Sequence, residues 1–484
     1  MSRNSAISHW PDSGTIYENV GELLRLPVYM PKKEAMDKYG LYFKEKCKNS
    51  AAYYEAAKKY IPGGVQHNLS QNHPFPLSIS KTEGAYMWDA DENRYVDLLQ
   101  AGGATLLGNN YRPVIDKALE VMSPTGPAPG LFTEYEVKLA ELITDFVPHV
   151  DMVRMLASGT EADIAAIRMA RCYTGKKKII KMGGGYHGWG DQLVYSLHIP
   201  GTGRFEAHGI PEECTFHTAE AKAHDLALME EIFKQAEKEG GVAAVILEPL
   251  GPESATHPVP RDFNKGVREL CDRYGSLLIF DEVVTGFRVG LGCAQSYFDV
   301  APDITVFGKI IAGGFPAAGA VGGRKDVMSS LAAGVSADGT PRAYVGGTLT
   351  ASPLSCAGGY FALKAIDETD AAVKAGLAGD KLTEGIRDLI KQYNLPFVAY
   401  NHASICHFEA SGLMHLDIKA PDFEKQFAAR RKAIGMMGLA LEAEGVIVLA
   451  GSRLYTSLAD TDDVIDETLE AFERVLSELE PVQV

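Results

Sequence analysis

The sequence has 484 residues, of which 46% are hydrophobic and 23% are charged, and it contains 49 glycines and 24 prolines. This length and composition are typical of a globular protein of about two or three domains, and they exclude a collagen, a coiled coil and a disordered chain. The formal net charge is −16, and such a chain repels nucleic-acid phosphates and anionic lipids.

The cysteine pattern and the N-terminal segment predict a cytoplasmic protein. Seven cysteines are scattered along the chain without a CxxC pair, which argues against a disulfide framework and a zinc ribbon. No basic segment followed by an apolar run opens the sequence, and no uncharged apolar run reaches the roughly 18 residues that a membrane helix needs. We therefore expect neither nucleic acid nor a membrane as a partner. We expect no metal, since the histidines and cysteines lack ligand spacing.

Residues 1–60 are predicted to form an N-terminal arm. A helix is expected over residues 31–60, because the pattern ends before Pro62, Gly63 and Gly64. Residues 85–99 then alternate apolar and polar side chains around a turn at 89–93, which predicts a hairpin with one buried face. This small β element opens a large domain that we expect to span residues 61–355.

Within the large domain, short β-branched apolar runs alternate with helix-period segments. This alternation predicts an α/β fold with a mainly parallel sheet. Strands are expected at residues 152–157, 177–182, 242–249, 277–282, 304–309 and 317–323, and helices at 161–175 and 264–275. Residues 356–484 begin with a long helical stretch and continue with mixed patterns, which predicts a smaller α+β domain.

Polar residues that directly follow apolar strands are the first candidates for a site, because open α/β sheets bind ligands beyond the carboxyl ends of their strands. Ser158, Gly159, Thr160 and Glu161 follow the first strand and open a helix. Backbone N–H groups and two hydroxyls at a helix N-terminus can bind a phosphate. The alternative is a structural capping box, because Ser158 and Glu161 have the S-x-x-E spacing.

Two further strand ends carry charged residues. Asp281 ends the run LLIFD, and a buried carboxylate needs a cationic partner, either a protonated ring nitrogen or an arginine such as Arg288. Lys309 ends ITVFGK, where apolar surroundings would favour a neutral, nucleophilic amine; the alternative is a lysine that extends to solvent. A phosphate site, a carboxylate and a lysine together meet the requirements of pyridoxal phosphate.

The segment GGGYHG offers a competing interpretation. Gly183, Gly185 and Gly188 match G-x-G-x-x-G after a predicted strand, as in dinucleotide-binding proteins. The following residues do not form a clear amphipathic helix, and no acidic residue ends a second strand about 20 positions later. The sequence therefore favours an aromatic loop, which either packs on the core or belongs to the site.

Longer segments around these residues carry a family resemblance: VRMLASGTEADIAAIRMAR, GGGYHGWGD, IFDEVVTGFR, DITVFGKIIAGGFPAAGAVGG and GGTLTASPLSCAGG. The sequence closely resembles the class-III, fold-type-I pyridoxal-phosphate aminotransferases, and within them the glutamate-1-semialdehyde 2,1-aminomutase-like group. The resemblance implies that Lys309 holds the cofactor as an internal aldimine and shuttles protons. It also implies that Asp281 keeps the ring nitrogen protonated and that Val283 lies under the ring.

The remaining roles also follow from the resemblance. Ser158, Gly159 and Thr160 would bind the cofactor phosphate. Tyr186 would stack on the ring face, with His187 close by. Thr348 would contact the phosphate of the neighbouring subunit's cofactor, which implies a homodimer.

Several positions depart from the aminomutase pattern. Ser70 stands where aminomutases of this group have an arginine that binds the substrate carboxylate, and Glu253 stands where they have an asparagine near the cofactor's 3-oxygen. Residues 100–104, QAGGA, replace a tryptophan-containing run, which should widen the pocket mouth. Arg453 resembles the carboxylate-binding arginine of β-amino-acid aminotransferases, so we expect it to bind the acidic end of the substrate.

These departures leave the reaction open. We expect an aminotransferase that moves an amino group from a small amino acid or amine bearing an acidic group to a keto or aldehyde acceptor. The alternatives are an intramolecular aminomutase, and a lyase or racemase on the same scaffold. A non-enzymatic protein is not favoured, because Lys309, Asp281 and the phosphate site are all intact.

Overall fold

The computed structural model describes residues 5–68, 72–333, 341–449 and 453–483, and it divides into two compact units. Unit 1 comprises Met1–Ser13 with Arg112–Val373, and unit 2 comprises Gly14–Tyr111 with Lys374–Val484. These bounds differ from the predicted segments 1–60, 61–355 and 356–484, because strands from the two ends of the chain pair within unit 2. Strand β1 (Val28–Pro31) pairs with β16 (Leu479–Val482), and β4 (Arg94–Asp97) pairs with β14 (Val446–Ile447).

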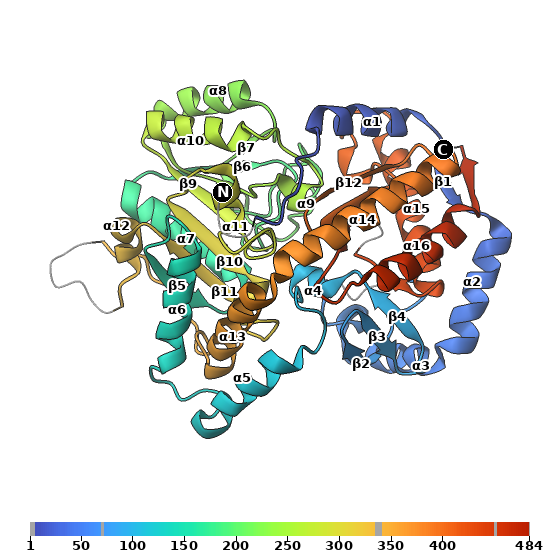
Figure 1. Cartoon of the computed structure of the whole chain (residues 1–484). Coiled ribbons are helices and arrows are strands. Elements are labelled where there is room, and N and C mark those ends of the chain that lie inside the picture. Colours follow the sequence, from blue (N-terminus) through green and yellow to red (C-terminus); the bar gives the residue numbers. More distant parts are fainter. Residues whose placement is uncertain (1–4, 69–71, 334–340, 450–452, 484) are drawn as a thin grey trace. The chain divides into compact units, whose positions relative to one another are not determined.

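Unit 1 is built on a seven-stranded sheet in the order β5-β11-β10-β9-β8-β6-β7 (Figure 1). The strands are β5 (Met152–Leu156), β6 (Lys178–Met182), β7 (Thr218–Ala221), β8 (Val242–Leu247), β9 (Leu277–Glu282), β10 (Ile304–Gly308) and β11 (Gly319–Gly323). All neighbours from β10 to β7 are parallel, whereas β11 runs antiparallel to both β10 and β5. The predicted α/β fold with a mainly parallel sheet is confirmed.

Both faces of this sheet are buried, which explains the continuous apolar runs of its strands. Successive side chains of a strand point to opposite faces. In β9, Leu277 and Ile279 therefore join the core on the side of α7 (Gly159–Thr174), and Leu278 and Phe280 join the core on the side of α8 (Leu226–Glu237) and α10 (Phe263–Tyr274). Figure 1 shows α7 on one side of the sheet and α8 and α10 on the other. The same alternation directs Asp281 toward the α7 side.

The other helices of unit 1 are shorter or lie outside these two layers. Helix α13 packs against α5, α6 and the short 3-10 helix η4, which begins at Lys309. Their bounds are α5 (Arg112–Thr125), α6 (Glu134–Phe146), α9 (Pro252–Ala255), α11 (Cys293–Phe298), η4 (Lys309–Ala312), α12 (Lys325–Met328) and α13 (Pro353–Thr369).

Unit 2 contains three smaller sheets, with strand orders β1-β16, β12-β13-β15 and β14-β4-β3-β2. The remaining strands are β2 (Ile79–Glu83), β3 (Tyr86–Asp89), β12 (Val398–His402), β13 (Ile405–Glu409) and β15 (Arg453–Tyr455). The helices that end or lie in this unit are α1 (Ser13–Arg25), α2 (Lys33–Lys46), α3 (Lys48–Ala57), α4 (Gln100–Gly103), α14 (Ala371–Gln392), α15 (Phe423–Ala443) and α16 (Asp462–Leu476). Among the described residues, no helix is long and apolar enough to cross a membrane.

The local predictions for unit 2 are correct for the hairpin and incomplete for the arm. Strands β3 and β4 form the predicted hairpin, and Asp89 closes its turn by accepting the N–H groups of Asp91 and Asn93, both at 2.9 Å. The single helix expected over residues 31–60 is two helices. The chain leaves helical geometry at Cys47, whose buried thiol lies 3.7 Å from the Tyr95 hydroxyl.

Candidate active site

The segment after β5 caps helix α7 and leaves its N-terminus available to an anion. The Ser158 hydroxyl accepts the Glu161 N–H at 3.2 Å, while the Glu161 carboxylate accepts the Ala157 N–H at 3.0 Å. The capping interpretation is therefore correct for Ser158. It does not exclude anion binding, because the first N–H groups of a helix have no acceptor within the helix.

Val283 lies where three chain segments approach one another closely. A Cβ added to Gly308, at the end of β10, would lie 2.8 Å from a Val283 methyl carbon. A Cβ added to Gly159, the first residue of α7, would lie 3.0 Å from the other methyl carbon. The two glycines thus allow the valine to sit between α7 and β10. Similarly, a Cβ on Gly188 would overlap Thr160, so the GGGYHG loop packs directly on the start of α7.

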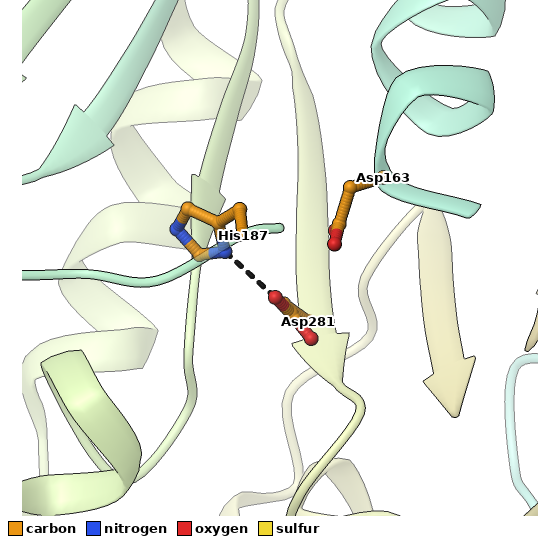
Figure 2. Close-up of side chains that lie close together, drawn as sticks. All are labelled: Asp163, His187 and Asp281. Carbon is orange, nitrogen blue, oxygen red and sulfur yellow. Dashed lines mark hydrogen bonds and ion pairs between the residues drawn. The ribbon is translucent and has the colours of Figure 1, made fainter. Parts of the chain in front are cut away.

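Asp281 and His187 form a buried hydrogen-bonded pair at the end of β9 (Figure 2). The His187 Nδ1 lies 2.7 Å from Asp281 Oδ2, and Asp281 Oδ1 accepts the Val283 N–H at 3.0 Å. Burial lowers the pKa of His187, although the Asp281 carboxylate opposes this effect. A neutral imidazole that donates from Nδ1 leaves a lone pair at Nε2, and this buried atom has no hydrogen-bond partner among the described residues.

Asp163 is a member of the site that the sequence analysis missed. It lies one turn into α7, is 1% exposed, and points toward Asp281 in Figure 2. Its Oδ1 has no hydrogen-bond partner in the described part of the chain. Burial, followed by the charges of Asp281 and Glu248, raises the pKa of Asp163 well above its ordinary value, and the Lys309 ammonium opposes this shift. A signal was present in the sequence, because Asp163 is a charged residue among the alanines of a buried helix face.

Three atoms that could bind a metal, one each from Asp163, His187 and Asp281, lie within 4.8 Å of one another. A divalent cation can be bound by such a set. However, the His187 and Asp281 atoms at 2.7 Å are already bonded to each other, and a cation would have to break that bond. In this structure the set is a hydrogen-bonded His187–Asp281 pair with a third carboxyl group, Asp163, beside it.

Lys309 begins the 3-10 helix η4 immediately after β10. Its φ of 50° lies in the left-handed region, which is unfavourable for a residue with a side chain and is concentrated at functional sites. The side chain is half-buried, and its charge acts on Asp163 across the site. The structure thus brings together a lysine amine, a carboxylate with its histidine, and the N-terminus of helix α7.

Glu253 and Tyr186 lie in one hydrogen-bonded network beside this cluster. The buried Glu248 carboxylate accepts the N–H groups of Tyr186 at 3.1 Å and of Glu253 at 2.8 Å. The Glu253 carboxylate lies 3.2 Å from His198 Nδ1, and the His198 ring stacks on the Tyr186 ring at a centroid distance of 6.0 Å. Burial and the Glu253 charge raise the pKa of Glu248 to about 8.

The other candidates are placed less directly. Thr348 is exposed and lines a pocket with Phe132, Glu136 and Ser352, and its contact with a second subunit stays a prediction. Arg453 begins β15 in unit 2, and its role in binding substrate stays a prediction. Gln100 is buried in unit 2, where its amide donates to Asp460 at 3.2 Å. Ser70 lies outside the described residues.

Comparisons with known proteins give one consistent result. Residues 68–476 match the family described as Aminotransferase class-III. The chain is 36% identical over 437 residues to glutamate-1-semialdehyde 2,1-aminomutase 2 from Exiguobacterium sp. strain AT1b, covering 88% of this chain and 96% of that protein.

Two solved structures have similar folds. An omega-transaminase from Sphaerobacter thermophilus is 29% identical with a TM-score of 0.79, covering 90% of this chain and 99% of that one. A β-phenylalanine aminotransferase from Variovorax paradoxus is 25% identical with a TM-score of 0.77, covering 92% of this chain and 97% of that one.

Proposed function

Because this chain belongs to the class-III aminotransferase family, we propose that it is a pyridoxal-phosphate-dependent aminotransferase whose substrate is a small amino acid or amine bearing an acidic group. Its acceptor is a keto acid or an aldehyde. The observation that carries this proposal is the convergence of Lys309, the Asp281–His187 pair and the start of α7 around Val283.

The residues present fit pyridoxal phosphate. When bound, this cofactor withdraws electrons from the substrate carbon that carries the amine. Asp281 would keep the ring nitrogen protonated, and His187 orients Asp281 through Nδ1. Val283, whose methyl groups occupy the space that Gly159 and Gly308 leave free, would contact the ring. Tyr186 would stack on the ring, and the N–H groups of Gly159 and Thr160 would bind the phosphate at the start of α7.

Lys309 performs the proton transfer. With the cofactor bound, its Nζ would accept the proton from the substrate carbon that carries the amine and would later return it. Glu253 of unit 1 would offer a polar contact to the substrate. The family resemblance assigns the substrate's acidic group to Arg453, through a bidentate guanidinium contact.

An intramolecular aminomutase is the second candidate, and the 36% identity to an aminomutase favours it. Ser70 and Glu253 argue for the transaminase, because serine removes the arginine that binds carboxylate in the resembling aminomutases and glutamate adds a negative charge at the pocket. We further propose a cytoplasmic homodimer in which Thr348 contacts the partner's cofactor. The pocket that contains Thr348 is also lined by three exposed apolar residues, Leu131, Phe132 and Leu349. Their exposure supports an interface with a second subunit at this surface.

Lys309→Ala tests the cofactor assignment directly. Borohydride reduction of the cofactor-loaded wild type should fix the cofactor on one peptide, the one containing Lys309, as read by mass spectrometry. The variant should lose this adduct and lose amino transfer by a factor of about 10² to 10⁴ or more, the range of general acid–base catalysis. Lys325→Ala, an exposed lysine of unit 1, is the matched control and should keep both properties. An adduct on another lysine would refute the assignment.

A further inference from the structure

Asp163 has no role in the function proposed above, although it lies at its centre. Two acidic side chains lie close together there, Asp163 from α7 and Asp281 from β9, and the charge of Glu248, from the segment after β8, also acts on Asp163. Lys309, after β10, faces Asp163, and His187 from the GGGYHG loop pairs with Asp281. Figure 2 shows Asp281 between the other two labelled side chains, with His187 on one side and Asp163 on the other.

The burial of Asp163 decides its protonation state. An ionised carboxylate that is removed from water needs a partner, and Asp163 Oδ1 has none among the described residues. Asp281 already has both oxygens hydrogen-bonded, one by His187 and one by the Val283 N–H, whereas Asp163 Oδ1 has no such donor among the described residues. Two neighbouring carboxyl groups in a dry site keep one proton between them, and here the proton belongs on Asp163.

A protonated Asp163 has an O–H donor and needs an acceptor. An Asp281 carboxylate oxygen, which lies within 4.8 Å of an Asp163 carboxylate oxygen, is the acceptor that we assign to it. The cluster of Asp163, Asp281 and neutral His187 then carries a single negative charge, which matches a single positive charge on a ring nitrogen. If Asp163 were ionised, the same cluster would carry two negative charges.

We propose that Asp163 is a positioning residue that, as a neutral carboxylic acid, orients Asp281 toward the cofactor's ring nitrogen and holds the cluster at one negative charge. This inference rests on the proposed cofactor. It goes beyond the proposed function because it assigns a role to a side chain that the reaction scheme does not use.

The test compares Asp163→Asn, a neutral isostere that keeps a donor, with Asp163→Ala, which removes the donor. Asp116→Asn, a change to a surface carboxylate paired with Arg112 on α5, is the control. Each full-length protein is loaded with pyridoxal phosphate, and the absorbance of the lysine-bound cofactor is titrated against pH. The dissociation constant of the cofactor is measured by adding it back to cofactor-free protein.

Asp163→Asn should keep the titration midpoint within about 0.3 pH unit of wild type, because no charge is removed. Asp163→Ala should weaken cofactor binding about tenfold, through loss of the hydrogen bond to a charged group. The infrared difference between wild type and Asp163→Asn should contain the carbonyl stretch of a protonated carboxylic acid, and the Asp116→Asn difference should lack it.

Three results would overturn the inference. A midpoint lowered by a full unit or more in Asp163→Asn would mean that an ionised carboxylate had been removed near Lys309. An infrared difference without the acid band would mean the same. Equal cofactor affinity in Asp163→Ala and wild type would remove the orienting role. A wild type that binds no cofactor on any lysine would instead refute the proposed function, and it would do so before any variant is compared.

Discussion

Val283 packs between Gly159 and Gly308, two residues at which a side chain would meet its methyl groups. The methyl groups have room because Gly159 and Gly308 carry no Cβ. In a close-packed interior, one extra carbon at either glycine must displace the valine or the backbone that carries it. The valine methyl groups would then move into the space assigned to the cofactor ring.

Gly308→Ala should therefore weaken cofactor binding. Overpacking of this kind costs about 1–3 kcal/mol, so the dissociation constant should rise by roughly 5- to 150-fold. Adding Val283→Ala to the same chain should recover most of the loss, because it removes the methyl groups that the new carbon meets. Titration of cofactor into the cofactor-free proteins measures both effects. Gly40→Ala, where an added Cβ meets nothing within 4 Å, is the control.

The strand-end residues of the site stand out in the sequence, whereas Asp163 is marked only by being a charged residue among the alanines of a helix. Asp281 and Lys309 each interrupt an apolar run, and the geometry of parallel sheets places such residues at one edge. Asp163 lies within a helix, and its side chain meets Asp281 only when α7 packs on β9. The sequence also does not identify the residue that hydrogen-bonds to Asp281, because His187 lies 94 residues earlier in the chain and no local pattern connects the two.

At the start of helix α7, one residue, Ser158, caps the helix and also belongs to the proposed phosphate site. The Ser158 hydroxyl accepts a backbone N–H, so it stabilises the helix whether or not a ligand is bound. Thr160, by contrast, lies within the first turn and is not the capping residue. The two hydroxyls therefore allow the capping and phosphate-binding roles to be separated.

Ser158→Ala should destabilise cofactor-free protein by about 1 kcal/mol, the usual cost of losing an N-cap, and should also weaken phosphate binding. Thr160→Val should weaken phosphate binding while leaving the melting temperature of the cofactor-free protein close to that of wild type. Thermal unfolding and titration with cofactor measure the two properties. Equal melting temperatures for Ser158→Ala and wild type would contradict the capping role.

The strands with strong apolar runs were predictable, and the weak strands were missed for identifiable reasons. Strands β8, β9 and β10 are buried on both faces, so nearly every residue is apolar. Strand β7 has the sequence TAEA and pairs with β6 alone, at the edge of the sheet, where few apolar residues are required. Strand β1 is only four residues long and ends in Pro31, and its partner β16 lies more than 440 residues away. Pairing over such separations leaves no local pattern.

For the chain as a whole, the stability of unit 2 depends on a buried acid that links distant segments. Glu442, near the end of α15, accepts the Asn72 amide at 2.9 Å across 370 residues of sequence. Burial raises the pKa of Glu442 to about 8, from an ordinary value of 4.5. Between these values the folded chain binds this proton more tightly than the unfolded chain does, so stability falls as the pH rises.

Glu442→Gln should remove this pH dependence, because glutamine has no proton to lose. Relative to wild type, the variant should gain stability as the pH rises from about 5 to 8, by at most about 1.4 kcal/mol per pH unit. Above the pKa of Glu442 the difference should level off. Melting temperatures of the two proteins at a series of pH values provide the measurement, and a difference that stays constant with pH would contradict this account.

We propose that this enzyme transfers the amino group of one substrate to a second substrate. The most direct measurement is a single turnover of the cofactor-loaded protein with a panel of α-, β- and ω-amino acids in the absence of an acceptor. For a transaminase, one donor should convert the lysine-bound cofactor to its amine form and release one keto or aldehyde product per site. Return of the starting absorbance together with an isomerised amine, or with ammonia, would contradict the transaminase and support an aminomutase or a lyase.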